Sequence, residues 1–133
     1  MAGASEMLER FDVPHEVHVM SAHRTPEKVA ELASNARDDG YGVIICGAGM
    51  AAHLAGAVSA HTTLPVIGVP LSGGVNGGID ALLSTVQMPR GIPVATVAVD
   101  GSANAAVLAV EILSLSNPDL VDRLKSFRDE GAR

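Results

Sequence analysis

Short apolar runs alternate with amphipathic helical stretches along this chain, and that alternation most constrains its fold. Residues 42–46 (Gly-Val-Ile-Ile-Cys) form an uninterrupted apolar run, which is typical of a strand covered on both faces. Residues 26–38, just before it, carry their apolar side chains at helical spacing. Strands that alternate with helices lie parallel and are joined by right-handed crossovers, so the pattern predicts a doubly wound α/β sandwich.

The same reasoning predicts the other elements. Glycine and proline interrupt the apolar pattern at its boundaries, and the glycine-rich residues 71–78 are predicted to be an irregular loop. No repeat or linker divides the sequence, so residues 1–133 are predicted to form a single domain. We predict strands over residues 15–20, 42–46, 65–69 and 93–99. Helices are predicted over residues 2–11, 26–38, 79–86 and 103–114, from residue 51 or 52 to residue 60, and from Pro118 onward.

Composition narrows the possible functions. Hydrophobic residues make up 47% of the chain but aromatic residues only 2%, so Ala, Val, Ile and Leu must build the core, and further apolar surface is expected between subunits. The net charge of -6 and the lack of a basic run argue against a nucleic-acid partner. No secretory leader or membrane-length apolar run is found, which predicts a cytoplasmic protein. The single cysteine, Cys46, indicates neither a disulfide nor a metal site.

The sequence Ser-Ala-His-Arg-Thr-Pro at residues 21–26 is the first candidate site. Thr25 as N-cap and Pro26 at the first helical position mark a helix start directly after a predicted strand. In open α/β sheets ligands bind at such connections, where a helix N-terminus favours an anion. Arg24 adds a planar fork of donors, and the imidazole of His23 can exchange protons near neutral pH. The alternative is an ordinary hydrogen-bonded turn with a solvent-exposed arginine.

A second candidate follows the next strand. Residues 47–49 (Gly-Ala-Gly) lie between a strand and a helix, where a phosphate or a ring can bind, although such glycines also make simple tight turns. They are not a dinucleotide fingerprint, because position 52 is alanine. His53 could donate a hydrogen bond to a substrate or be a structural histidine. No histidine pair has metal-ligand spacing on a helix, so no metal is predicted.

Together these motifs are more specific than any one alone. Residues 21–26, 47–49 and 51–54 (Ala-Ala-His-Leu) are followed by Leu-Pro-Val-Ile-Gly-Val-Pro at 64–70, Val-Gln-Met-Pro at 86–89, Pro-Val-Ala-Thr-Val-Ala at 93–98 and Asn-Ala at 104–105. Over nearly its whole length the chain resembles the N(5)-carboxyaminoimidazole ribonucleotide mutase family of purine biosynthesis. Two pieces, Ser-Ala-His-Arg and Ala-Ala-His-Leu, resemble its microbial class more than the animal-type class that uses free CO2.

The resemblance implies a flavodoxin-like three-layer sandwich with a parallel sheet, assembled as a homo-octamer. It also implies a cofactor-free isomerase that moves a carboxyl group from the exocyclic nitrogen of the ribonucleotide to ring carbon 4. His23 would be the general acid and base, which an imidazole suits because it exchanges protons near neutral pH. The matching substrate-binding positions are Ser21 and Arg24 for the phosphate and Gly49, Ala51, His53 and Leu54 for the ring and the migrating CO2.

The sequence departs from the family pattern in three places. Met50 replaces the usual second glycine, and Ala55 replaces the proline of His-Leu-Pro-Gly. The opening strand and its Gly-Ser-x-Ser-Asp turn, which contact phosphate and ribose in the family, are missing. That strand is central in flavodoxin-like order, so we expect either a gap in the sheet or strands that close up. We therefore expect a shortened version of a longer protein or a natural variant with impaired activity.

Three functions remain open at this point. The leading hypothesis is the mutase. The second is a non-catalytic nucleotide-binding or assembly subunit that keeps the fold, which the missing opening favours and the presence of His23 and Arg24 disfavours. The third is an aminoimidazole ribonucleotide carboxylase that uses CO2 directly. Chromatography of substrate and product with and without bicarbonate distinguishes them.

Overall fold

The structure is a computed structural model that describes residues 1–132. Its elements alternate between helices and strands through most of the chain, as the apolar pattern predicts. In chain order they are α1 (Ala2–Arg10), α2 (Pro26–Asn35), β1 (Ile44–Gly49), α3 (Leu54–Ser59), β2 (Val66–Leu71), the 3-10 turn η1 (Val75–Gly77), α4 (Ile79–Val86), β3 (Ala95–Thr96), α5 (Ser102–Ser114) and α6 (Pro118–Asp129).

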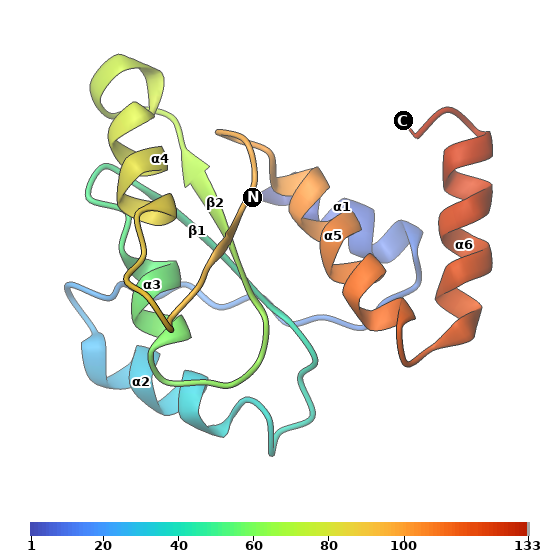
Figure 1. Cartoon of the computed structure of the whole chain (residues 1–133), viewed down its shortest axis with the longest axis horizontal. Coiled ribbons are helices and arrows are strands. Elements are labelled where there is room, and N and C mark those ends of the chain that lie inside the picture. Colours follow the sequence, from blue (N-terminus) through green and yellow to red (C-terminus); the bar gives the residue numbers. More distant parts are fainter. Residues whose placement is uncertain (133) are drawn as a thin grey trace.

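A parallel sheet in the order β1-β2-β3 forms the middle layer. Helices α2, α3 and α4 cover one face, and α5 covers the other, with α1 and α6 packed around it (Figure 1). Successive residues of β2 face opposite layers: Val66 packs with α2 and α3, whereas Ile67 packs with α5. The predicted α/β sandwich with a parallel sheet is therefore confirmed. No helix within residues 1–132 has the length and apolar character needed to cross a membrane.

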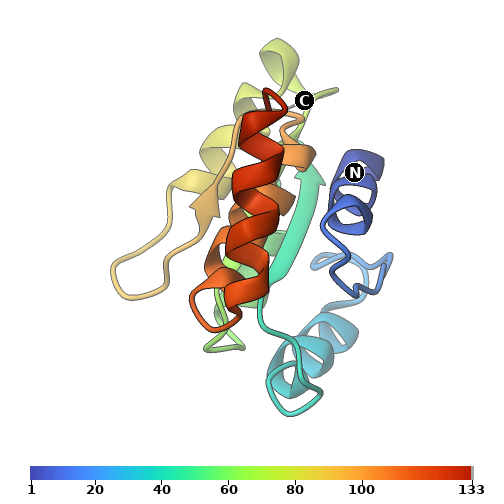
Figure 2. The ribbon, with the colours of Figure 1, turned by 90° about the vertical axis from the view of Figure 1, so that its right-hand side faces the viewer.

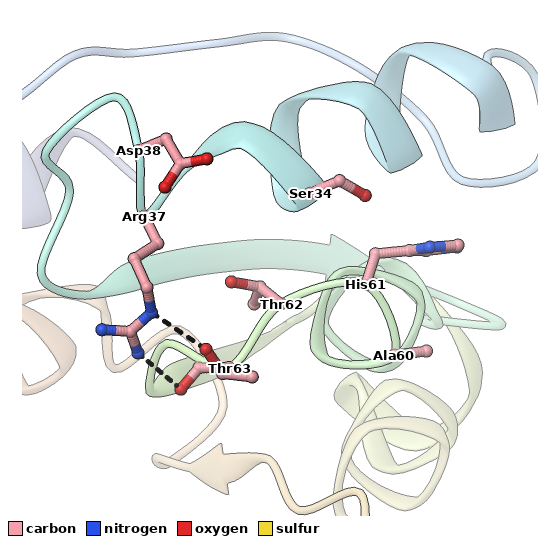
Figure 3. A pocket seen from close by; sticks show the side chains of 7 residues that line it. All are labelled: Ser34, Arg37, Asp38, Ala60, His61, Thr62 and Thr63. Carbon is pink, nitrogen blue, oxygen red and sulfur yellow. Dashed lines mark hydrogen bonds between the residues drawn. The ribbon is translucent and has the colours of Figure 1, made fainter.

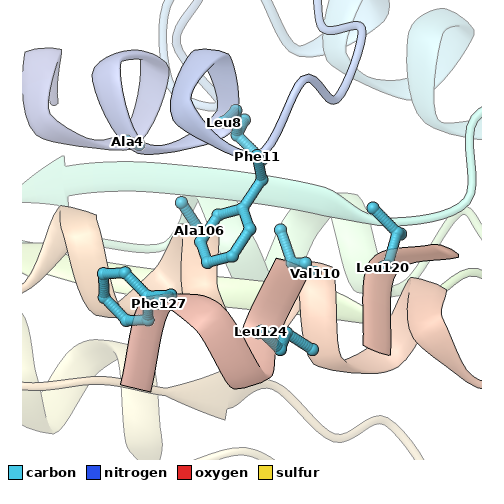
Figure 4. Packing of buried hydrophobic residues seen from close by; sticks show 8 residues of the cluster. All are labelled: Ala4, Leu8, Phe11, Ala106, Val110, Leu120, Leu124 and Phe127. Carbon is cyan, nitrogen blue, oxygen red and sulfur yellow. The ribbon is translucent and has the colours of Figure 1, made fainter. Parts of the chain in front are cut away.

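The layer of α1, α5 and α6 is held by the chain's two phenylalanines and several smaller side chains (Figure 4). The Phe11 and Phe127 rings meet edge to face with centroids 5.2 Å apart, a preferred aromatic geometry. Val110 of α5 is fully buried between them and the leucines of α1 and α6. This cluster joins the two ends of the chain and makes α1 an integral part of the fold.

Cys46 of β1 lies in the other core layer, under α2 and α3. Burial raises the pKa of its thiol to about 12, because the thiolate would lose its hydration there. The side chain behaves as a small apolar residue in the core.

The strand predicted over residues 15–20 is wrong. This segment is extended, but among residues 1–132 the backbone of 14–20 makes no backbone hydrogen bond. Val17 is 72% exposed and Val19 fully so. A strand needs a neighbour, and among the described residues β1 pairs on one edge only, with β2. Figure 2 shows β3 and α1 on opposite sides of β1. Of the two expected outcomes, the structure has the gap.

Other boundaries differ because pairing outweighs local composition. Strand β1 continues through the glycines predicted to break it, since residues 47–49 pair with residues 69–71 of β2. The strand predicted over 93–99 shrinks to Ala95–Thr96. Pro70 of β2 has no N–H to donate, which limits the ladder, although its carbonyl accepts from the Asp100 N–H at 2.9 Å.

Two helices are shorter than predicted. Helix α2 ends at Asn35 rather than residue 38, and a turn leads to Gly40, whose φ of 89° suits glycine. Helix α3 begins at Leu54 instead of residue 51 or 52, because residues 50–53 form tight turns. The Ala52 N–H donates to the Met50 carbonyl and the His53 N–H to the Ala51 carbonyl, both at 2.8 Å. The remaining helices match to within a residue or two.

Candidate active site

The turn over residues 21–25 is closed by hydrogen bonds between its two ends. The Ser21 N–H donates to Thr25 Oγ1, and that hydroxyl donates to the Ser21 carbonyl, both at 3.0 Å. The Thr25 N–H also donates to the Ser21 carbonyl at 2.8 Å. Thr25 is the N-cap residue, as predicted, but its hydroxyl is used in the turn and does not cap α2. The start of α2 therefore keeps unsatisfied N–H groups that can face an anion.

His23 and Arg24 project from this turn and are exposed. Within residues 1–132 neither side chain makes a hydrogen bond or an ion pair. The Arg24 N–H donates to Ser21 Oγ at 3.3 Å, which fixes the backbone beneath the guanidinium. A free guanidinium beside a helix N-terminus suits a phosphate, and a free imidazole next to it can exchange a proton with whatever binds there.

The connection between β1 and α3 carries the second group of predicted site residues. Gly49 ends β1 opposite Leu71 of β2. Ala51 and His53 are exposed, and Leu54, the first residue of α3, is half-buried. His53 is the N-cap residue of α3, but its side chain makes no capping hydrogen bond. These residues present small apolar groups and one imidazole at the carboxyl end of the sheet, where parallel α/β proteins bind ligands.

Met50 adopts a backbone conformation that L-residues avoid, with φ of 55°. Its side chain is 65% exposed, so little burial offsets the strain. We expect Met50→Gly to raise the free energy of unfolding by about 1 kcal/mol, since the left-handed conformation costs a non-glycine residue about 1–2 kcal/mol and glycine returns part of this as backbone entropy. Urea denaturation measures the change. Met50→Leu keeps the strain and serves as the control; equal midpoints for the two variants would contradict the argument.

Two carboxylates organise the glycine-rich loop after β2, and sequence reasoning missed both. Asp80 in α4 accepts from the Val75 N–H at 3.0 Å, and Asp100 accepts from the Ser72 N–H at 3.0 Å. The Ser72 hydroxyl and then its N–H lower the pKa of Asp100 below its usual value, because both stabilise the carboxylate. The position of Asp100 directly after a predicted strand was the signal that could have identified it.

Three loops therefore meet at one edge of the sheet. Gly49 pairs with Leu71, Ser72 is bonded to Asp100, and Thr85 of α4 donates weakly to the Ala52 carbonyl at 3.4 Å. Within residues 1–132 no hydrogen bond joins the residue 21–25 turn to residues 49–54, and α2, which begins at this turn, packs on α3. The structure thus groups the predicted residues into two clusters, Ser21, His23 and Arg24 in one and Gly49, Ala51, His53 and Leu54 in the other.

A surface hollow of about 360 Å³ lies elsewhere, beyond the carboxyl ends of α2 and α3 (Figure 3). Arg37 in its wall already donates to the Thr63 hydroxyl at 2.9 Å and the Thr63 carbonyl at 3.1 Å. Helix carboxyl ends repel anions, and Asp38 adds another negative charge. None of the predicted site residues lines this hollow, and we do not assign it to the active site.

No group of three or more His, Cys, Asp or Glu side chains that could hold a metal ion occurs within residues 1–132. The fold and its loops place this chain among the parallel α/β proteins whose ligand sites lie at the carboxyl edge of the sheet.

Comparison with known proteins identifies the group within that class. The AIR carboxylase family profile matches residues 1–133. The N5-carboxyaminoimidazole ribonucleotide mutase of Pyrococcus abyssi is 53% identical over 133 residues, which are all of this chain and 76% of that protein. A crystal structure of Treponema denticola PurE has a TM-score of 0.86 and 28% identity, covering 98% of this chain and 82% of that one. The chain belongs to the AIR carboxylase family.

Some relatives are far longer. The chloroplastic phosphoribosylaminoimidazole carboxylase of Vigna aconitifolia is 53% identical over 130 residues, which are 98% of this chain but 23% of that protein. The similarity to it therefore concerns one part of a larger protein.

Proposed function

We propose that this chain is an N5-carboxyaminoimidazole ribonucleotide mutase of purine biosynthesis. The main support is the pair His23 and Arg24, exposed and unpartnered within residues 1–132, at a helix start in the sequence Ser-Ala-His-Arg. The 53% identity to the Pyrococcus abyssi mutase over the whole chain supports the same reaction. The proposed place of action is the cytoplasm.

In the proposed reaction, Arg24, Ser21 and the N-terminus of α2 bind the phosphate. The bond between the exocyclic nitrogen and the carboxyl carbon breaks, CO2 leaves, and His23 gives the nitrogen a proton. Ring carbon 4 then forms a bond to the trapped CO2, and the proton on that carbon passes to His23, which restores the imidazolium. Gly49, Ala51, His53 and Leu54 enclose the ring and the CO2, because escape of CO2 would uncouple the two steps.

Chromatography of substrate and product tests this proposal. We expect the chain to convert the N5-carboxylated ribonucleotide to the 4-carboxylated one without added bicarbonate. A product formed only from aminoimidazole ribonucleotide and bicarbonate would instead establish the carboxylase, a reading favoured by relatives such as the Vigna aconitifolia protein that bear that name. No product under either condition would establish the non-catalytic alternative.

We further propose a homo-oligomer, and specifically an octamer. Helix α4 presents Ile79, Leu83 and Val86 on one face at 40%, 51% and 45% exposure, and such a stripe is typical of a subunit contact. We expect light scattering at micromolar concentration to give about eight times the 13.6 kDa chain mass. Leu83→Glu, which charges the stripe, should lower that mass, whereas Leu115→Glu on another exposed leucine should not. A monomeric mass for the unaltered chain would contradict the proposal.

A further inference from the structure

The imidazole of His53, the N-cap residue of α3, lies against a buried glycine of that helix, Gly56. A Cβ atom placed on Gly56 would be 2.5 Å from His53 Cε1 and 2.8 Å from Nδ1, distances that real Cβ contacts do not allow. The two residues are three apart, so they share one face of α3. The ring thus occupies the space that any other residue at position 56 would fill with its side chain.

Met88, which follows α4, is the other residue close to the Cβ position of Gly56. Its sulfur lies 3.1 Å from the same Cβ position, so imidazole and thioether converge on one point. Met88 follows α4, which is tied to the preceding loop of α3 through the bond from Thr85 to the Ala52 carbonyl. The Met88 sulfur and the His53 ring therefore border the same small space over Gly56, and sulfur beside an aromatic ring is a favourable contact.

Glycine destabilises a helix relative to alanine, so a glycine inside a helix usually has a packing or functional role. Close approach of another backbone is the common reason, yet the three nearest atoms to the Gly56 Cβ position are all side-chain atoms, two of them in His53. Ala55 and Val58 are buried in the core beneath α3, on sides of the helix other than the one where Gly56 lies. The lack of a side chain at Gly56 therefore makes room for the His53 ring and is not needed for a close approach of another backbone to α3.

We infer that Gly56 is a positioning residue that, with Met88, sets the orientation of the His53 imidazole toward the substrate. The inference rests on the proposed function, in which His53 contacts the ring of the ribonucleotide. Exposed at the N-cap of α3 and held by no hydrogen bond of its side chain within residues 1–132, His53 depends on this packing for its direction. A hydrogen bond from a correctly aimed imidazole is worth much more than one from a ring free to rotate.

Gly56→Ala tests the inference, because the clashing atoms belong to the end of an exposed side chain that can rotate away. We expect the variant to fold with an unchanged or higher melting temperature, since alanine favours the helix. The ring would lose its position, and kcat/KM should fall roughly tenfold to a hundredfold, mainly through a higher KM. In a His53→Ala background, Gly56→Ala should have no further effect. An equal fall in kcat/KM in both backgrounds would overturn the inference.

Nuclear magnetic resonance of the full chain gives a readout that does not depend on turnover. The wild-type protein should show cross-relaxation between the His53 Hε1 proton and the Gly56 α protons. In Gly56→Ala, the ring resonances of His53 should shift, while those of the other four histidines stay in place. Unchanged His53 resonances would refute the positioning role. Absence of turnover by the wild-type chain would instead refute the proposed function, with the resonance result still standing.

Discussion

His23→Asn should abolish measurable turnover while leaving the fold and the assembly intact. Loss of a general acid and base costs about 10²–10⁴-fold in rate, and here one group serves both proton transfers. Asparagine is close to imidazole in size but exchanges no proton at neutral pH. The side chain of His23 is exposed and makes no hydrogen bond within residues 1–132, so its replacement removes no stabilising contact.

The assay follows conversion of the N5-carboxylated ribonucleotide, with circular dichroism and light scattering to check fold and mass. His61→Asn is the matched control, because His61 is also exposed but lies past the carboxyl end of α3, away from the helix starts. It should keep full activity. Near-normal turnover by His23→Asn would remove His23 from the role of proton shuttle and leave the turn as an anion site only.

Local patterns could predict the elements that are defined by their own residues. The start of α2 at Pro26 could be predicted because proline, which has no N–H to donate, is favoured at the first position of a helix, directly after the N-cap Thr25. Strand β2 is buried along nearly its whole length, and its continuous apolar run is visible in the sequence. The grouping of Gly49 and His53 after β1 likewise follows from the rule that ligand loops sit at the carboxyl ends of parallel strands.

Features that depend on a distant partner could not be predicted. Residues 15–20 have the composition of a strand, but strand formation needs a neighbour to pair with, and the described residues 1–132 supply none. Conversely, residues 47–49 have the composition of a turn but are held extended by β2. The roles of Asp80 and Asp100 depend on loops that fold back onto them. The contact of Met88 with the space over Gly56 likewise depends on a distant element, because Met88 follows α4.

The open edge of β1 leads to the prediction with the other large effect. On one side of the gap, β1 offers unpaired backbone groups. On the other side, residues 14–20 are extended and make no backbone hydrogen bond among residues 1–132. Val17 and Val19 of that segment are 72% and 100% exposed, although valine favours a packed strand. An inserted strand would pair with both edges and cover these side chains, which removes two edges of the kind that folded proteins avoid.

The start of α1 already lies where such a strand would end. A Cβ on Gly47 would meet the side chain of Met1, so the first residue of the chain touches β1 close to its carboxyl end. A strand grafted ahead of Met1 would then run parallel to β1 before passing into α1. A Gly-Ser-x-Ser-Asp turn at its end would fall beside the connection from β1 to α3 that holds Gly49 and His53.

We therefore expect a graft of a family-like first strand with this turn to raise both the melting temperature and the affinity for substrate. Each hydrogen bond to a charged group contributes about 1.5–3 kcal/mol. Serine and aspartate contacts to phosphate and ribose together should lower KM by roughly a hundredfold or more, since about 1.4 kcal/mol is tenfold. The same graft with alanine at the serine and aspartate positions is the control: it should keep the gain in melting temperature and lose the gain in affinity. If the ungrafted chain already has an ordinary KM and neither graft changes it or the melting temperature, then other residues hold the phosphate and the gap accepts no strand.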